Sequence, residues 1–129
     1  MFFQSKKTPT LGELGENLAI KYLQNKNYKI IEKNFKNPSG RRLGEIDIIA
    51  AEKKSLVFIE VKTRVSKNYL ILPEENITKS KLFKLSKIIQ FYISSHDLWE
   101  VSYRIDAISI IIDQNTKKAQ IKHLKNIFS

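Results

Sequence analysis

The stretch "GEIDIIAAEKKSLVFIEVKTR", residues 44–64, sets charged side chains inside two apolar runs. The runs, at about 43–50 and 56–63, are rich in Ile and Val, and the polar "AEKKS" between them is typical of a β-hairpin. Because successive side chains of a strand point to opposite faces, Glu60 and Lys62 share one face of the second run, and the opposite face is wholly apolar. This hairpin decides the fold, and its charges need an explanation.

The register of the hairpin brings two acids together. A loop centred between Lys53 and Lys54 places Asp47 directly across from Glu60. Directly opposed residues have Cβ atoms about 4.5 to 5.5 Å apart, and like charges placed in this way are destabilising. Either one acid is protonated or a cation lies between them, and hard oxygen ligands at this separation suit Mg²⁺, which also binds water and substrate phosphates.

Lys62 extends this pair along the same face, about one strand repeat beyond Glu60. A Lys in that place can orient or deprotonate a metal-bound water, or stabilise charge that develops on a phosphate. The three side chains therefore predict a site that cleaves phosphodiesters. In the alternative interpretation, Glu60 and Lys62 form an exposed ion pair worth about 0 to 1 kcal/mol. The apolar runs favour the site, because they indicate strands covered on both faces, where unpartnered charges are costly.

Two helices and three further strands are predicted outside the hairpin. Thr10 and Glu13 form a capping box before the first helix, and Thr78 precedes the second. Glu16 lies at the margin of the first helix's apolar stripe, from where its carboxylate can reach a neighbouring element. The order of elements predicts an α/β sandwich around a mixed sheet. The expected ranges are 11–25 and 79–95 for the helices, 28–35, 101–113 and 119–124 for the strands, and 64–77 for a long loop.

Composition places the chain among globular proteins with one core. A chain of 129 residues is long enough for a single domain, and we expect residues 1–9, ahead of the first helix, to form a flexible arm. The absence of Cys excludes disulfides and Cys-based zinc sites. No apolar run is long enough to span a membrane and the start does not resemble a secretory signal, so the cytoplasm is the expected location.

The charge balance suggests a polyanionic partner. Lys and Arg number 23 against 13 Asp and Glu, a formal net charge of +10, which favours nucleic acid. Most of these cations are Lys spread along the chain, so a solvated surface remains the alternative. Lys residues in the first half of the second helix oppose its macrodipole, whereas a phosphate suits that end; the alternative is that these Lys side chains are simply solvated and cost little. The candidate phosphate contacts are Arg41, Arg42, Arg64 and Lys67, which flank the hairpin strands, and Lys81 in the second helix.

Arg104 and Asp106 alternate on one face of the strand predicted at 101–113. An internal ion pair that supports the sheet is the favoured interpretation, and a substrate contact is the alternative.

Six strings carry a family resemblance: "GELGENLAIKYL", "GEIDIIA", "LVFIEVKTR", "ITKSK", "RIDAISI" and "IKHLKNIF". In this order they resemble the YraN-like bacterial proteins, a family with the PD-(D/E)XK nuclease fold that is similar to archaeal Holliday-junction resolvases. The resemblance covers about residues 11–128, and the ordered set is more specific than any one string. It implies a restriction-endonuclease-like core, a mixed central β-sheet flanked by helices.

The resemblance also implies roles for particular residues. Asp47 and Glu60 match the two acidic metal ligands of such nucleases, and Lys62 matches the catalytic Lys. Glu16 matches the acid of the first helix that completes the metal site and the catalytic set.

Three further positions follow by the same comparison. Glu45 belongs to the family's "GEIDII" string and is expected in the second shell or as an alternative ligand. Lys81 matches a Lys of the second helix. Ile46 stands where the motif that names the fold has Pro, so that motif gives no support by itself.

The expected function is that of an endonuclease dependent on Mg²⁺ or Mn²⁺ that hydrolyses DNA, with branched or recombination structures implied by the likeness to resolvases. A basic adaptor that keeps the fold and binds nucleic acid without cutting is the main alternative. In a third interpretation Asp47 and Glu60 only join internal polar pairs. Cutting two strands of a junction needs two sites, which leaves a homodimer open, and the sequence identifies no interface for one.

Overall fold

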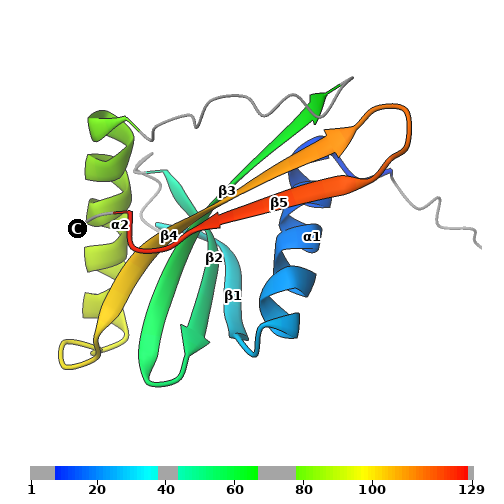
Figure 1. The fold of residues 1–129 in the computed structure, drawn as a ribbon. Helices are drawn as coiled ribbons and strands as arrows, with labels where there is room; N and C mark the ends of the chain where they lie inside the picture. Colours follow the sequence, from blue (N-terminus) through cyan, green and yellow to red (C-terminus); the bar gives the residue numbers. More distant parts are fainter. Residues whose placement is uncertain (1–7, 38–43, 67–77, 128–129) are drawn as a thin grey trace, which may run out of the picture.

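The computed structural model describes residues 8–37, 44–66 and 78–127, which form two helices and five strands (Figure 1). Every predicted element is present, and the observed bounds lie close to the predicted ones. β3 is the main exception, because it continues into the expected loop at 64–77, of which residues 67–77 lie outside the described ones. The elements are α1 (Leu11–Asn25), β1 (Lys29–Lys36), β2 (Glu45–Glu52), β3 (Ser55–Ser66), α2 (Lys79–Ser95), β4 (Tyr103–Asp113) and β5 (Ala119–Leu124).

Both helices begin at the predicted caps. The Thr10 hydroxyl accepts a hydrogen bond from the backbone N–H of Glu13 at 3.1 Å, and the Thr78 hydroxyl accepts one from Lys81 at 3.2 Å. Each cap satisfies a backbone donor that the first turn of a helix leaves without a partner. The expected arm at 1–9 precedes the first cap, and residues 1–7 of it lie outside the described part of the chain.

The sheet is mixed, in the order β1-β2-β3-β4-β5, and only β3 and β4 run parallel. The hairpin of β2 and β3 has the predicted register, with Ile48 opposite Ile59 and Glu52 opposite Ser55. Its loop is therefore the pair Lys53 and Lys54, and Lys53 adopts the left-handed conformation, with φ 56°, that tight hairpin turns require. A two-residue loop fixes which side chains share a face.

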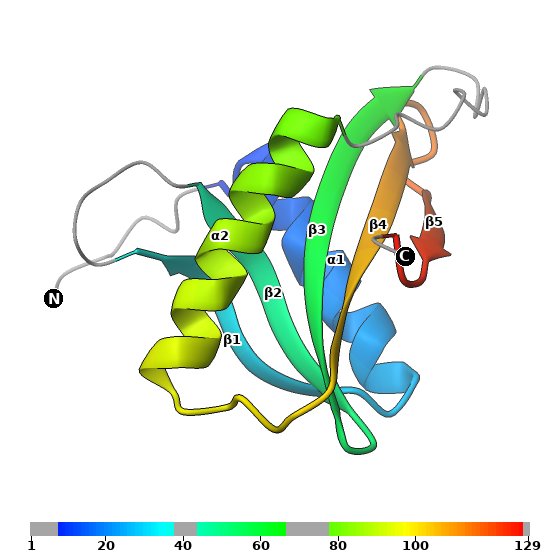
Figure 2. The same cartoon turned by 90° about the vertical axis from the view of Figure 1, so that its left-hand side faces the viewer.

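One helix packs on each face of the sheet (Figure 2). Ala19 and Leu23 of α1 pack with buried strand residues Ile48, Ala50, Val57, Ile59, Ile108, Ile110 and Ile112. Residues of α2 pack on the other face with Ile46, Ile49, Leu56, Phe58 and Ile105. The central strands are thus covered on both faces, as their apolar runs predicted. A charged side chain among them is held largely away from water.

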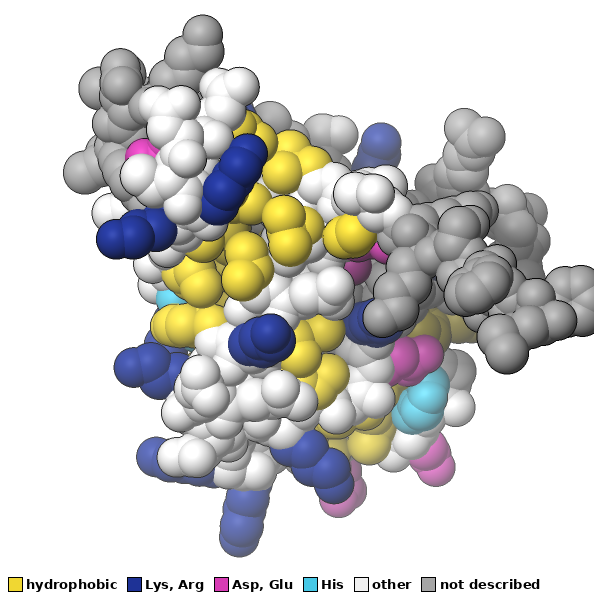
Figure 3. All heavy atoms as spheres, turned by 90° about the vertical axis from the view of Figure 1, so that its right-hand side faces the viewer, with side chains coloured by type: hydrophobic (Ala, Val, Ile, Leu, Met, Phe, Trp, Pro, Cys, Tyr) yellow, Lys and Arg dark blue, Asp and Glu magenta, His cyan; other side chains and the backbone are white. Residues whose placement is uncertain are grey.

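The helices also turn apolar side chains to the solvent. Leu11 and Leu14 of α1 are 42% and 38% exposed, and hydrophobic side chains gather on the side of the molecule where α1 and β5 lie (Figure 3). Phe83 of α2 is exposed as well. Among the described residues, neither helix is long and apolar enough to cross a membrane.

Arg104 and Asp106 form the predicted internal ion pair, with Arg104 Nε 3.0 Å from Asp106 Oδ1. Asp106 is fully buried and also accepts hydrogen bonds from His123 Nε2 at 2.8 Å and from the Asn126 backbone at 2.9 Å. Arg104 reaches in addition to Glu52, at 3.0 Å. The network ties β2, β4 and β5 together, so these residues support the sheet.

Candidate metal centre

Asp47 lies where the pairing of β2 with β3 ends. Cα pairing between the two strands runs from Ile48 to Glu52, so Asp47 is the first residue of β2 beyond the paired part. Its Oδ2 accepts a hydrogen bond from the backbone N–H of Val61 in β3 at 2.8 Å. A side-chain carboxylate therefore takes the place of a main-chain carbonyl at this end of the hairpin, and Asp47 is only 8% exposed.

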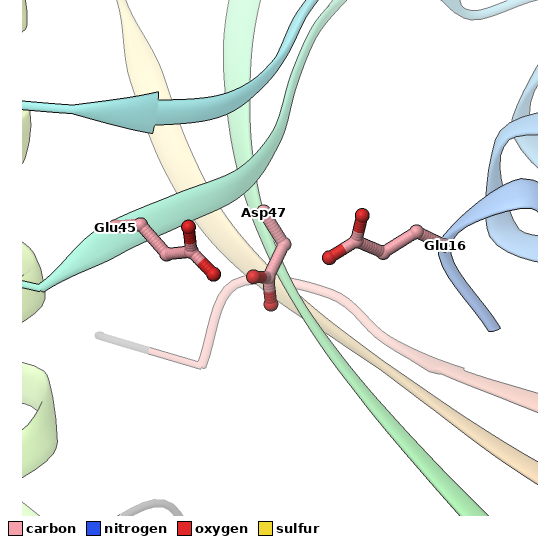
Figure 4. A group of neighbouring side chains, drawn as sticks. All are labelled: Glu16, Glu45 and Asp47. Carbon is pink, nitrogen blue, oxygen red and sulfur yellow. The ribbon is translucent and has the colours of Figure 1, made fainter. Parts of the chain in front are cut away.

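Three carboxylates meet at this point. Glu16 of α1 and Glu45 and Asp47 of β2 each offer one oxygen, and these oxygens all lie within 4.8 Å of one another. Figure 4 shows the three side chains pointing toward one another, with Glu16 and Glu45 on either side of Asp47. An all-oxygen, acidic donor set is the kind that Mg²⁺ and Mn²⁺ prefer, so these residues fit the expected metal.

Gly15 brings α1 close enough for Glu16 to take part. A Cβ at position 15 would lie 1.7 Å from Thr63 Oγ1 of β3, so only glycine allows this approach. A Cβ placed at Gly12, one turn earlier, would have no neighbouring atom closer than 4.0 Å. The contact between Gly15 and Thr63 therefore sets where α1 packs along β3. It places the next residue, Glu16, at the acidic cluster.

Asn34 of β1, the strand next to β2, contacts the cluster through Glu16. Its neighbours Lys33 and Phe35 pair with Ile48 and Ile46, so Asn34 stands opposite Asp47 in the register. Its backbone is left-handed, with φ 55°, a conformation that Asn tolerates better than most residues. The Asn34 side chain hydrogen-bonds Glu16, which lowers the pKa of that carboxyl, although burial outweighs the bond and the pKa is raised on balance.

The carboxylates of the cluster repel one another, and the effect is largest at Asp47. Burial first, and the neighbouring charge of Glu60 second, raise the pKa of Asp47 to about 7. The hydrogen bond from Val61 acts in the opposite direction, and the charges of Glu16 and Glu45 add to the rise. Without a bound cation, Asp47 is therefore partly protonated near neutral pH. A divalent cation would remove this repulsion. The hairpin register suggested two ways to offset it, protonation of one acid or a bound cation.

Glu60 lies beside this cluster but points to a different partner. Its carboxylate forms an ion pair with Lys81 of α2, and the Glu60 side chain is 9% exposed against 45% for Lys81. The predicted metal ligands Asp47 and Glu16 are thus brought together, Glu45 joins them, and Glu60 is held by a lysine. A hairpin register cannot reveal this pairing, because Lys81 comes from a distant helix.

Lys62 follows Glu60 by two residues on β3 and is partly buried. Burial lowers the pKa of its ammonium, and the nearby charges of Lys81 and Arg64 lower it further, while Glu60 opposes them. Arg64 is therefore close enough to act on Lys62. The other predicted phosphate contacts, Arg41, Arg42 and Lys67, lie outside the described residues.

A cleft of about 460 Å³ opens between the acids and the start of α2. One wall is acidic and comes from β2 and β3, and the other is the first two turns of α2. Its described lining is Gly44, Glu45, Asp47, Glu60, Thr78, Ser80, Lys81, Lys84 and Leu85. Two residues that position the site, Gly15 and Asn34, were not singled out from the sequence. The preference of Asn for left-handed backbone is a signal that could have identified Asn34, whereas only the docking of the helix reveals Gly15.

These features define an α/β protein in which a mixed five-stranded sheet carries one helix on each face and an acidic group at the open end of a hairpin. The architecture is compatible with a restriction-endonuclease-like core. The chain belongs to the uncharacterised protein family UPF0102, whose sequence profile matches residues 15–110. This confirms the resemblance to the YraN-like proteins.

Relatives share about two fifths of the sequence over nearly its whole length. A UPF0102 protein of Caldanaerobacter subterraneus subsp. tengcongensis is 41% identical over 120 residues, which cover 92% of this chain and 94% of the relative. One of Caldicellulosiruptor bescii is 39% identical over 119 residues, covering 92% and 96%. One of Clostridium botulinum (strain Kyoto / Type A2) is 42% identical over 119 residues, covering 92% and 93%.

Proposed function

We propose that this protein is a nuclease dependent on Mg²⁺ or Mn²⁺ that hydrolyses phosphodiester bonds of DNA in the cytoplasm. The observation that carries the proposal is the meeting of three carboxylate oxygens within 4.8 Å of one another, of which those of Glu45 and Asp47 belong to residues that line a cleft whose other wall is basic. An acidic wall alone would repel a phosphodiester, whereas an acidic wall that holds a divalent cation attracts it. The lysines of α2 would hold the same anion from the opposite side.

Glu16, Glu45 and Asp47 are the residues that would hold the metal, with Glu60 beside them. A bound Mg²⁺ or Mn²⁺ supplies Lewis acidity and lowers the pKa of a coordinated water. Asp47 must be ionised to serve, and its carboxylate is already oriented by the Val61 N–H. Glu16 is oriented by Asn34, so two of the three acids have a fixed direction before any ligand arrives.

Lys62 would act on the reacting phosphate. In hydrolysis the water loses a proton to the solvent as its oxygen forms a bond to phosphorus, the bond from phosphorus to one ester oxygen breaks, and that oxygen leaves with the electron pair and takes up a proton. The Lys62 ammonium can orient the water and offset the negative charge that grows on the phosphoryl oxygens.

A cleavage assay tests the proposal. Linear, single-stranded, flapped and four-way DNA would be incubated with Mg²⁺ or Mn²⁺ and with wild type, Asp47→Asn, Glu60→Gln or Lys62→Ala. Glu100→Gln, which neutralises an exposed acid outside the cleft, is the matched control. We expect turnover by wild type and the control and a loss of roughly a hundredfold or more in the three site variants. Equal turnover by all of them would sink the assignment of the site.

A non-catalytic adaptor for nucleic acid is the second candidate. The net charge of +10 and the engagement of Glu60 by Lys81 favour it, since both are compatible with a cleft that binds phosphate without cutting. Its signature is DNA binding that weakens steeply with salt, with no turnover and no metal affinity that depends on Asp47.

A further inference from the structure

Among the predicted metal ligands, Glu60 is the one that the structure pairs with a lysine of the cleft. Its carboxylate pairs with the Lys81 ammonium across the cleft, and the acid is nearly buried while the lysine is about half exposed. Glu60 nevertheless lies close enough to Asp47 for its charge to act on that carboxyl. The lysine thus occupies the position of a counter-ion for an acid that borders the metal cluster.

Lys81 also faces the space where a phosphate would lie. It lines the cleft together with Thr78, Ser80 and Lys84 of the basic wall. Because the side chain of Lys81 is about half exposed, it can turn from Glu60 toward an anion in the cleft without unfolding α2. Glu60 has no such freedom, because it sits in a strand whose residues are buried on both sides.

A phosphate in the cleft therefore competes with Glu60 for one ammonium group. If Lys81 turns to the phosphate, the Glu60 carboxylate is left nearly buried without its cation, which is costly. A divalent cation at the neighbouring acids relieves that cost. Conversely, a cation that satisfies Glu60 releases Lys81 to the phosphate. Each ligand thus favours the other, and by linkage the two effects are equal in size.

We propose that Lys81 couples the two halves of the site, so that phosphodiester and divalent cation bind with positive cooperativity through exchange of the Lys81 ion pair with Glu60. This inference rests on the proposed metal site. It adds that the free protein holds its metal weakly and gains affinity when DNA enters the cleft. Lys81 is accordingly a positioning residue that acts through Glu60 as well as a phosphate contact.

The coupling is measured by binding alone. The dissociation constant of a fluorescent phosphorothioate DNA duplex is determined by anisotropy in EDTA and in Mg²⁺. The value in EDTA divided by the value in Mg²⁺ gives the ratio that is compared among variants. Lys81→Met removes the exchanging ammonium, and Lys84→Met removes the same charge from the same wall while leaving the Lys81–Glu60 ion pair in place. Comparing ratios cancels the general screening of DNA by Mg²⁺.

We expect Lys84→Met to weaken duplex binding in both conditions and to keep the wild-type ratio, and Lys81→Met to reduce the ratio by roughly fivefold or more. In calorimetric titration without DNA, Lys81→Met should bind Mg²⁺ more tightly than wild type, because Glu60 has lost its competing cation. Equal ratios for the two Lys variants, or weaker Mg²⁺ binding by Lys81→Met, would overturn the coupling. Failure of the metal site itself has a different signature, which is Mg²⁺ binding by Asp47→Asn equal to that of wild type.

Discussion

The Cα of Gly15 lies so close to the Thr63 side chain that a methyl group added at position 15 would stand 1.7 Å from Thr63 Oγ1 and 2.7 Å from Thr63 Cβ. The docking of α1 on β3 thus depends on the absence of a side chain. Because Glu16 is the next residue, the same contact sets where one of the three cluster carboxylates stands.

Gly15→Ala should therefore destabilise the fold and disturb the acidic cluster together. Overpacking of this kind costs about 1 to 3 kcal/mol of unfolding free energy, and α1 must shift away from β3 to relieve it. Gly12→Ala in the same helix meets no atom closer than 4.0 Å and should be neutral or stabilising by up to about 1 kcal/mol. Urea denaturation and Mg²⁺ titration of both variants check this, and similar behaviour of the two would contradict it.

Asp47→Asn should stabilise the metal-free protein at neutral and alkaline pH. Since burial and Glu60 raise the pKa of Asp47 to about 7, ionising it costs stability in the folded state. The carboxyl contributes its full stability below its unfolded pKa, and that stability is lost as the pH rises toward about 7. The amide keeps an oxygen that can accept the Val61 N–H.

Thermal melts in EDTA at about pH 5 and about pH 8 test this sign. The gain in melting temperature of Asp47→Asn over wild type should be larger at the higher pH, and the Glu100→Gln control should show no such difference. A loss of stability in Asp47→Asn at both pH values would support the interpretation of Asp47 as a member of an internal polar pair.

Asn34→Gly should weaken metal binding with little effect on the backbone. Glycine keeps the left-handed conformation at φ 55° but removes the side chain that hydrogen-bonds Glu16. The pKa of Glu16 should then rise further, and Mg²⁺ must displace a proton more often. Asn27→Gly is the matched control, because Asn27 has φ 69° in the turn after α1. We expect a several-fold loss of Mg²⁺ affinity at about pH 6 for Asn34→Gly and none for Asn27→Gly.

Asp106→Asn should be the most damaging neutralisation outside the cleft. Burial raises the pKa of Asp106, but hydrogen bonds from His123 and Arg104 outweigh it and hold the pKa below its ordinary value. The ionised form therefore contributes stability above the unfolded pKa that is lost as the pH falls through the folded one. Removing it leaves the partly buried Arg104 short of a counter-ion, which costs roughly 3 to 5 kcal/mol.

Glu52→Gln tests the partly exposed edge of the same network. Glu52 also bonds Arg104, but its side chain is 24% exposed, so we expect a cost of at most about 1 kcal/mol. Chemical denaturation of the two variants at neutral pH compares them, and equal losses would show that burial does not decide the effect.

Local pattern was enough to predict the elements, the caps and the hairpin register. Period-two and period-three-to-four apolar spacing identified strands and helices, and an even loop between Lys53 and Lys54 fixed which residues face each other. The same register brought Asp47 and Glu60 to one end of the hairpin, where the structure has them.

Two contacts between distant elements, those of Glu60 and of Glu45, could not be predicted from the sequence. The partner of Glu60 depends on where the first turn of α2 stands above the sheet, and the closeness of Glu45 to Glu16 depends on how deeply α1 docks at Gly15. Neither distance is encoded in a repeat or a spacing, since both result from packing of whole elements. The candidate ligands and the meeting of Glu16 with Asp47 could therefore be predicted, but the presence of Glu45 in the cluster and the pairing of Glu60 with Lys81 could not.

The bond from the Val61 N–H to Asp47 has a consequence for spectroscopy. Because the Val61 nitrogen lies 2.8 Å from an oxygen of a titrating carboxylate, the chemical shift of its amide proton and that proton's rate of exchange with deuterium report the charge state of Asp47. One resonance in a two-dimensional nitrogen-proton spectrum thus follows protonation of the candidate centre without any label on the ligand. The backbone amide of Val61 in β3 therefore reports the protonation of Asp47.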